Sequence, residues 1–133
     1  MYYHVWFGTR ERKWLLLGDV EQKARDLLWE VARDKAIGLL ACQTMVEHVH
    51  LLLDTDPSEL PTALKLLKGI SSRKVFEAFP ELKLDAETNH FWQRRYGVKE
   101  VEPAALETVR AYIQTQKDRP EKFARTPRLP RRS

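Results

Sequence analysis

The segment 48–54 constrains the fold of this chain more than any other feature. It reads His-Val-His-Leu-Leu-Leu-Asp. Successive side chains of a strand point to opposite faces of a sheet, so an unbroken apolar run such as Leu51-Leu52-Leu53 indicates a strand with both faces buried. We therefore expect this segment to be a central strand of its sheet.

The region before this segment predicts a strand, a helix and a second strand. Aromatic and branched residues are typical of a strand over residues 2–9. Apolar residues recur at helical spacing over about residues 19–35, and Asp19 stands three residues before Gln22, which is the spacing of a capping box. The second strand is expected over residues 39–46.

The region after the segment predicts a helix, a strand and a last helix. Pro61 suits the first turn of the second helix. The inner face of that helix would carry Leu60, Leu64, Leu67 and Ser71. A loop is expected from Pro80 to Glu87, strand-like composition returns over residues 91–101 with an interruption at Gly97, and Pro103 is placed to open the final helix.

The order strand, helix, strand, strand, helix, strand, helix predicts an α+β fold. It is that of the ferredoxin-like (RRM-like) split β-α-β-β-α-β antiparallel sheet, with an additional C-terminal helix. In that layout the first and third strands are central. The histidines of the third strand would then lie near the middle of the sheet.

Length and composition fit a single domain, expected over residues 1–118. No apolar run approaches the ~20 residues that span a bilayer, and the N-terminus lacks the pattern of a secretory signal. We therefore expect a cytoplasmic protein without membrane contact. Cys42 is the only cysteine, which excludes an intrachain disulfide and a multi-cysteine zinc motif.

Residues 119–133 form a basic tail rich in Pro and Arg. From Lys117 onward the chain carries seven Lys or Arg against two acidic residues, whereas the rest is close to neutral. We expect this tail to be extended or disordered. Phosphate contacts of low specificity and a solubilising role explain it equally well.

His48 and His50 are candidate metal ligands. Side chains two apart on a strand share a face, so the two imidazoles can converge on one cation while Val49 enters the core. A pair of partly exposed histidines bonded to neighbours would show the same pattern. The final helix adds Tyr112 and Gln116, which lie four residues apart on one helical face. This face would supply a phenol as nucleophile and an amide oxygen as third ligand.

The sequence resembles the single-tyrosine transposases of the smallest insertion sequences, called TnpA, of the HUH nuclease superfamily, with the REP-associated tyrosine transposases as relatives. The superfamily motif of a histidine, a bulky hydrophobe and a histidine is His48-Val49-His50 here, and the family's Tyr-Ile-x-x-Gln motif is residues 112–116. Residues 67–73 are similar to its Lys-Gly-x-x-Ser-Arg stretch, and Phe91-Trp92 with Tyr96 resembles the strand before its last helix.

Three features depart from the family pattern. Val46-Glu47 stands where members commonly have Met-Pro-Asp before the first histidine. The first strand is one residue off the usual aromatic spacing, so no role is carried over to it. The basic tail is not a hallmark of the family.

The resemblance implies a transposase that cleaves and rejoins single-stranded DNA at insertion-sequence ends through a covalent 5′-phosphotyrosine at Tyr112. It implies Mg²⁺ or Mn²⁺ held by His48, His50 and Gln116, although two imidazoles alone would suit zinc or manganese better than magnesium. It also implies DNA with a folded hairpin as substrate, and a homodimer formed by sheet extension in which the final helix can be shared between subunits.

The candidate DNA contacts are basic side chains of the second helix and of the segment before the last strand. They are Lys65, Lys68, Arg73, Arg94 and Arg95. A solvated helix flank would explain the lysines about equally well. Trp92 and Tyr96 are more often core residues than stacking platforms for unpaired bases, although aromatics beside arginines suit that role.

Two other functions remain open at this point. A non-catalytic or domesticated module could bind single-stranded nucleic acid on a ferredoxin-like sheet. Such a binder has no need of two histidines, a tyrosine and a glutamine in matching register. A metal-dependent phosphodiesterase that uses water is disfavoured, because Glu47 is expected on the strand face opposite the histidines and no other carboxylate stands near the motif.

Overall fold

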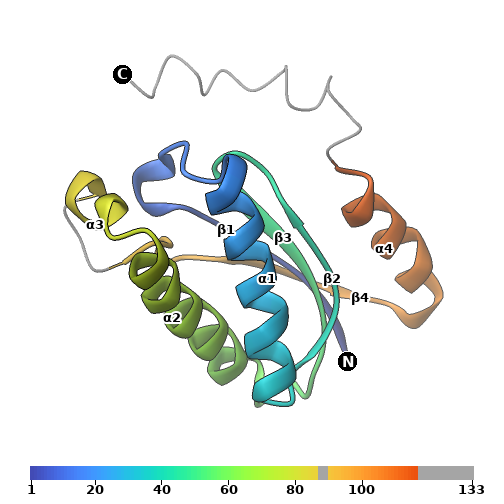
Figure 1. Ribbon diagram of the computed structural model, residues 1–133. Coiled ribbons are helices and arrows are strands. Elements are labelled where there is room, and N and C mark those ends of the chain that lie inside the picture. Colours follow the sequence, from blue (N-terminus) through green and yellow to red (C-terminus); the bar gives the residue numbers. More distant parts are fainter. Residues whose placement is uncertain (87–89, 117–133) are drawn as a thin grey trace.

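The computed structural model has a four-stranded antiparallel sheet with helices packed on both faces (Figure 1). It describes residues 1–86 and 90–116. The elements in chain order are β1 (Tyr2–Gly8), the short 3-10 helix η1 (Arg10–Arg12), α1 (Gly18–Asp34), β2 (Gly38–Thr44), β3 (His48–Asp54), α2 (Leu60–Ala78), α3 (Glu81–Ala86), β4 (Gly97–Val101), η2 (Pro103–Ala105) and α4 (Leu106–Gln114). The α+β class predicted from the sequence is confirmed.

The strands lie in the order β2-β3-β1-β4, and each neighbouring pair is antiparallel. The central position of β3 explains its apolar run, because Leu51, Leu52 and Leu53 are all fully buried. Leu51 and Leu53 face one side of the sheet and Leu52 faces the other, since side chains alternate along a strand. β3 therefore contributes to two separate apolar clusters.

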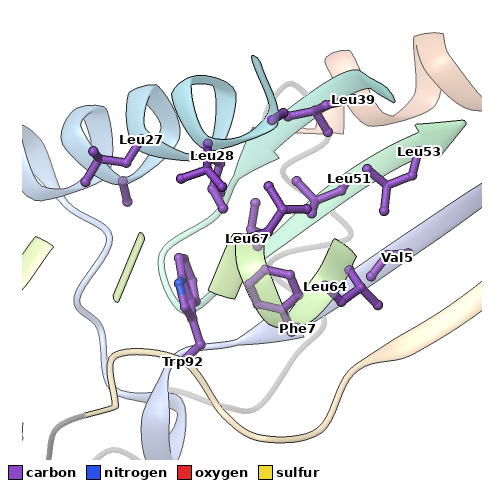
Figure 2. Close-up of a cluster of buried hydrophobic side chains, with 14 of the residues drawn as sticks. Val5, Phe7, Leu27, Leu28, Leu39, Leu51, Leu53, Leu64, Leu67 and Trp92 are labelled. Atoms are coloured by element: carbon purple, nitrogen blue, oxygen red, sulfur yellow. The ribbon is translucent and has the colours of Figure 1, made fainter. Parts of the chain in front are cut away.

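The larger cluster fills the space between the sheet and helices α1 and α2, which lie side by side over one face (Figure 1). Figure 2 shows Leu27 and Leu28 of α1 pointing toward Leu51 of β3, with Phe7 and Trp92 below them. Full burial of one such side chain contributes roughly 1.5–3 kcal/mol. This cluster therefore supplies most of the apolar stabilisation of the described residues.

The smaller cluster attaches α4 to the opposite face, beside β2 (Figure 1). Its buried members are Ala41, Leu52, Val101 and Ile113. A hydrogen bond adds to it, in which Gln43 Nε2 of β2 donates to the carbonyl oxygen of Gln114 over 3.0 Å. The helix that carries Tyr112 is thus held by far fewer apolar contacts than α1 or α2.

The structure corrects three local predictions. Asp19 lies inside the first turn of α1 and makes no capping hydrogen bond; Leu17 is the residue before the helix. The expected loop from Pro80 to Glu87 contains the short helix α3.

The expected strand over 91–101 is confined to β4, preceded by a single bridge between Thr9 and Trp92. Hydroxyl groups of α2 explain this difference. The backbone N–H of Phe91 donates to Ser72 Oγ, and Trp92 Nε1 donates to Ser71 Oγ. These bonds hold the segment against the helix and not beside a strand.

Two further predictions concern membrane spans and the C-terminal tail. Within the described part of the chain, the helices are too short or too polar to cross a membrane. The basic tail over 119–133 lies outside the described residues. Its extended or disordered state stays a prediction.

Candidate active site on the α4 face of the sheet

A row of four residues crosses the sheet on the face that carries α4. Gln43 of β2 pairs with His50 of β3, His50 pairs with Trp6 of β1, and Trp6 pairs with Gly97 of β4. Neighbouring strands lie ~4.8 Å apart, so each member can touch the next. The row places an amide, an imidazole and an indole beside one another in the middle of the molecule.

The histidine pair of β3 has the arrangement predicted from the sequence. The rings of His48 and His50 lie on the same face with their centroids 5.0 Å apart and their planes at 76°. Val49 between them is fully buried on the opposite face. Both imidazoles line one cavity, so a ligand in that cavity can reach them together.

His4 is a third imidazole that sequence reasoning missed. Its Nε2 lies 2.9 Å from Nδ1 of His50, and the two ring centroids are 5.1 Å apart. His4 stands two residues before Trp6 on β1, so strand alternation could have placed it on this face. Its contact with His50 depends on the register between β1 and β3, which no local pattern fixes.

Burial lowers the pKa of two of these imidazoles, those of His50 and His4. Burial, with repulsion from His48 and His4, lowers the pKa of His50 to about 3. Burial and the nearby Lys99 ammonium also lower the pKa of His4 below the usual histidine value. Neutral imidazole is the form that binds metal ions. The site thus holds His50 in the protonation state that a ligand role requires.

Tyr112 reaches this group from α4. Its ring meets that of His4 edge-on, with centroids 6.5 Å apart and planes at 71°, while its side chain is half-buried against the smaller cluster. His4 contacts His50 and His50 contacts His48. The phenol and the histidine pair are therefore linked through His4, a connection that the sequence did not predict.

Gln116 and Gln43 present buried amide oxygens near the end of α4. Gln116 is 8% exposed, and neither its Oε1 nor that of Gln43 accepts a hydrogen bond from the described residues. A buried acceptor without a partner is costly, roughly 1–3 kcal/mol. Oxygen atoms in this state suit a cation.

The ligands predicted from the sequence, His48, His50 and Gln116, carry nitrogen and oxygen donors of the kind that bind divalent ions. Among the residues described, no three His, Cys, Asp or Glu side chains converge on one point. Beyond the histidine pair, Gln116 offers a buried amide oxygen that accepts no hydrogen bond from the described residues. The carboxylate of Glu47 is 3% exposed and forms a salt bridge with Arg12 (Oε2 to Nε, 3.4 Å).

Two neighbouring cavities surround the histidine pair and the segment before β4. One, of about 420 Å³, is lined by the histidine pair together with Trp6, Tyr96 and two arginines, Arg12 and Arg95. The other, of about 290 Å³, is lined by Lys68, Arg73, Arg94 and His90. Gln93 borders both. Together they form a basic surface that leads from the histidines toward α2.

Four of the five basic residues predicted as DNA contacts lie on this surface. Lys68 Nζ donates to the carbonyl oxygens of Arg94 (2.8 Å) and Arg95 (3.4 Å), so this ammonium also holds the backbone before β4. Burial lowers the pKa of Lys68. Lys65 is exposed on α2 and lines neither of these cavities.

The aromatic candidates divide between core and surface. Trp92 is buried in the larger cluster and is therefore a core residue, not a stacking platform. Tyr96 is 40% exposed and lines the larger cavity. Trp6, which carried no predicted role, lines the same cavity and is 37% exposed.

Comparison with known proteins points to one family. Residues 1–116 match the family model described as "Transposase IS200 like". The chain is 30% identical over 118 residues to the ISDra2 transposase TnpA of Deinococcus radiodurans, covering 88% of this chain and 84% of that protein. It is 28% identical over 100 residues to the transposase for insertion sequence element IS200 of Salmonella typhimurium, covering 74% of this chain and 66% of that protein.

Two solved structures share the fold. A crystal structure from Deinococcus radiodurans R1, described as a transposase, has a TM-score of 0.70 and 32% identity, covering 87% of this chain and 90% of the other. The structure of a REP-associated tyrosine transposase bound to a REP hairpin has a TM-score of 0.57 and 20% identity, covering 86% of this chain and 65% of the other.

Proposed function

This chain belongs to the family of IS200-like transposases, and we propose that it cleaves and rejoins single-stranded DNA by transesterification through Tyr112. The observation that carries the proposal is the continuous contact from the Tyr112 ring through His4 to the histidine pair. A phenol next to imidazoles that are neutral at neutral pH suits phosphoryl transfer better than passive binding.

Tyr112 is the proposed nucleophile. Its phenolic oxygen forms a bond to phosphorus as the bond from phosphorus to the 3′-oxygen breaks, and the phenolic proton ends on that 3′-oxygen, which leaves as a 3′-hydroxyl. The 5′-phosphate then stays on Tyr112. One phosphodiester replaces another, so a second 3′-hydroxyl can reverse the step at a new junction without a nucleotide cofactor. Half-burial of the side chain supports this role, because it limits the directions in which the phenol can point.

His48, His50 and Gln116 would hold a divalent cation, Mg²⁺ or Mn²⁺. When bound, such an ion neutralises charge that builds up on the phosphate. The hydrogen bond between His4 and His50 supports this assignment. If Nδ1–H of His50 donates to a neutral His4, Nε2 of His50 keeps its lone pair for a ligand. Partners of this kind commonly orient metal-binding histidines.

The basic cavities would hold the DNA backbone. Lys68, Arg73 and Arg94 line one cavity and Arg95 the other, which suits phosphate contacts that position a strand without reading its sequence. We assign a strand with a folded hairpin as substrate, in line with the REP hairpin bound by the relative of the same fold. Lys65 lines neither cavity and would contact the DNA only if the strand continued along α2.

The proposed architecture is the ferredoxin-like split β-α-β-β-α-β sheet with α4 added. The strand order β2-β3-β1-β4 supports it. We further propose a homodimer formed by sheet extension at an edge strand, with α4 able to be shared between subunits. The small cluster that attaches α4 to its own sheet supports such sharing, because few contacts must be given up.

A covalent adduct with DNA tests this function. The protein is incubated with Mn²⁺ and single strands from the DNA that flanks its own coding sequence, and a denaturing gel then detects a protein-DNA adduct. We expect adduct with wild type and with Tyr96→Phe, a control that removes an exposed phenol. We expect none with Tyr112→Phe.

Variants of the two histidines distinguish a role in catalysis from a role in DNA binding. Replacement of His48 and His50 by Ala should abolish the adduct while DNA binding largely persists. Adduct formation by Tyr112→Phe at the wild-type level would disprove the assignment of the nucleophile. Tight binding by the wild type without any adduct would favour the non-catalytic binding module.

A further inference from the structure

We propose that the cavity beside the histidine pair seats one unpaired nucleobase of the DNA strand, stacked on the indole of Trp6. The base belongs to a nucleotide next to the phosphate that is cleaved. This inference rests on the proposed function, because the histidine pair brings that phosphate to the cavity.

Trp6 is unusual for a residue on a central strand. β1 has neighbours on both sides, yet the Trp6 side chain is 37% exposed and lines the cavity of about 420 Å³. Its neighbours Val5 and Phe7 point to the other face and are buried in the larger cluster. An indole left open at the centre of a sheet provides a flat apolar surface for an aromatic ligand.

Gly97 makes room for this indole. A Cβ added at Gly97 would overlap the indole at Cε2, Nε1 and Cζ2. Trp6 and Gly97 are paired on adjacent strands, so the ring system lies over the backbone of β4. The backbone of β4 and the His4 ring, whose centroid lies 5.0 Å from that of the indole, hold the indole in place, and its exposed part lines the cavity.

The rest of the cavity matches the other parts of a nucleotide. Arg95 lines it and carries positive charge suited to phosphate, and Tyr96, 40% exposed, offers a second aromatic ring; Arg12 lines it too but is paired with Glu47. The volume lies in the range of ~300–1,000 Å³ that small organic ligands occupy. Aromatic rings beside arginines are the usual lining of sites for unpaired bases.

The register places this base near the scissile phosphate. Trp6 and His50 are directly paired on adjacent strands, and their rings share the face of the sheet. A phosphate held at His48 and His50 would have its neighbouring sugar and base within reach of Trp6. The seat would therefore position the strand for attack by Tyr112, and would also favour an unpaired strand over a duplex.

The test compares two apolar replacements of similar size, Trp6→Phe and Trp6→Leu, of which only the first keeps an aromatic ring. Both are made in the Tyr112→Phe chain, and binding is measured by fluorescence anisotropy in EDTA. The probes are labelled oligo(dA), oligo(dT) and a strand of the same length in which every base is missing. Trp29→Leu is the matched control, because Trp29 is 41% exposed on α1.

We expect Trp6→Leu to weaken binding of the base-bearing strands by about 5- to 150-fold, the usual range for loss of one stacked base. Trp6→Phe should lose much less, Trp29→Leu almost nothing, and the strand without bases should bind all variants alike. Equal binding by the Phe and Leu variants would overturn the proposal. So would an equal loss for the strand without bases, or no binding of any strand.

The outcome is separate from that of the proposed function. The binding measurement uses no metal and no nucleophile, so a base-dependent loss in Trp6→Leu supports the seat even if wild type forms no covalent adduct. If wild type forms the adduct and Trp6→Leu binds as Trp6→Phe does, the transesterification stands and the base seat is wrong.

Discussion

Ile113→Ala should loosen helix α4 while leaving the rest of the fold in place. Ile113 is fully buried in the smaller cluster, where it packs with Leu52 and Val101 between α4 and the sheet. Truncation of a buried Ile to Ala costs about 2–5 kcal/mol. Since this cluster is the main apolar attachment of α4, we expect the cost to appear as local opening of the helix.

The expected magnitude follows from that range. A loss of 2–5 kcal/mol raises the equilibrium constant for opening by about 30-fold to about 4,000-fold. Amide hydrogen exchange of α4, compared with that of β3, measures this change directly. The covalent adduct should also form more slowly, because Tyr112 would spend less time beside His4.

Leu64→Ala is the matched control. Leu64 is buried on α2 in the larger cluster, so its truncation should lower the free energy of unfolding of the whole molecule in urea. The reasoning is refuted if Ile113→Ala leaves exchange of the α4 amides at the wild-type rate. It is also refuted if Ile113→Ala speeds the amides of β3 as much as those of α4.

Three further outcomes are expected. His4→Ala should weaken Mn²⁺ binding about 10- to 100-fold in a calorimetric titration, since His4 contacts His50 Nδ1; unchanged affinity would contradict its positioning role. Burial lowers the pKa of His50 to about 3, so its NMR signals should not titrate between pH about 5 and about 8. In the unfolded chain His50 binds its proton near pH 6.5, so the free energy of unfolding should decrease as the pH falls below that value. A titration midpoint of His50 near pH 6.5 in the folded protein would contradict this prediction. Trp92→Phe should cost about 1–3 kcal/mol in urea unfolding, because Ser71 loses its donor, whereas Trp29→Phe should cost almost nothing.

Local periodicity accounts for the part of the site that the sequence predicted. Alternation along β3 puts His48 and His50 on one face and Val49 in the core, and the apolar run of β3 marks it as central. Tyr112 lies on the predicted final helix, but α4 ends at Gln114 and does not extend to Gln116, so the expectation that the two residues share one helical face is corrected. Each of these features depends on residues within a few positions of one another.

Contacts between distant segments account for what the sequence missed. The hydrogen bond between His4 and His50 and the packing of Trp6 over Gly97 depend on the register of β1 with β3 and β4. The strand expected from Phe91 was wrong for a similar reason, because hydroxyl groups of α2 bind the backbone and indole donors of that segment. The sequence pattern of one segment does not indicate which distant segment it will contact.

The central claim is that Tyr112 becomes covalently bound to the 5′-phosphate of the cleaved strand. Mass spectrometry of the protease-digested protein-DNA adduct tests it most directly, because it identifies the modified residue. We expect the nucleotide mass on Tyr112, as a phosphodiester. A modification on another tyrosine, or cleaved DNA with a free 5′-phosphate and no modified peptide, would contradict the account.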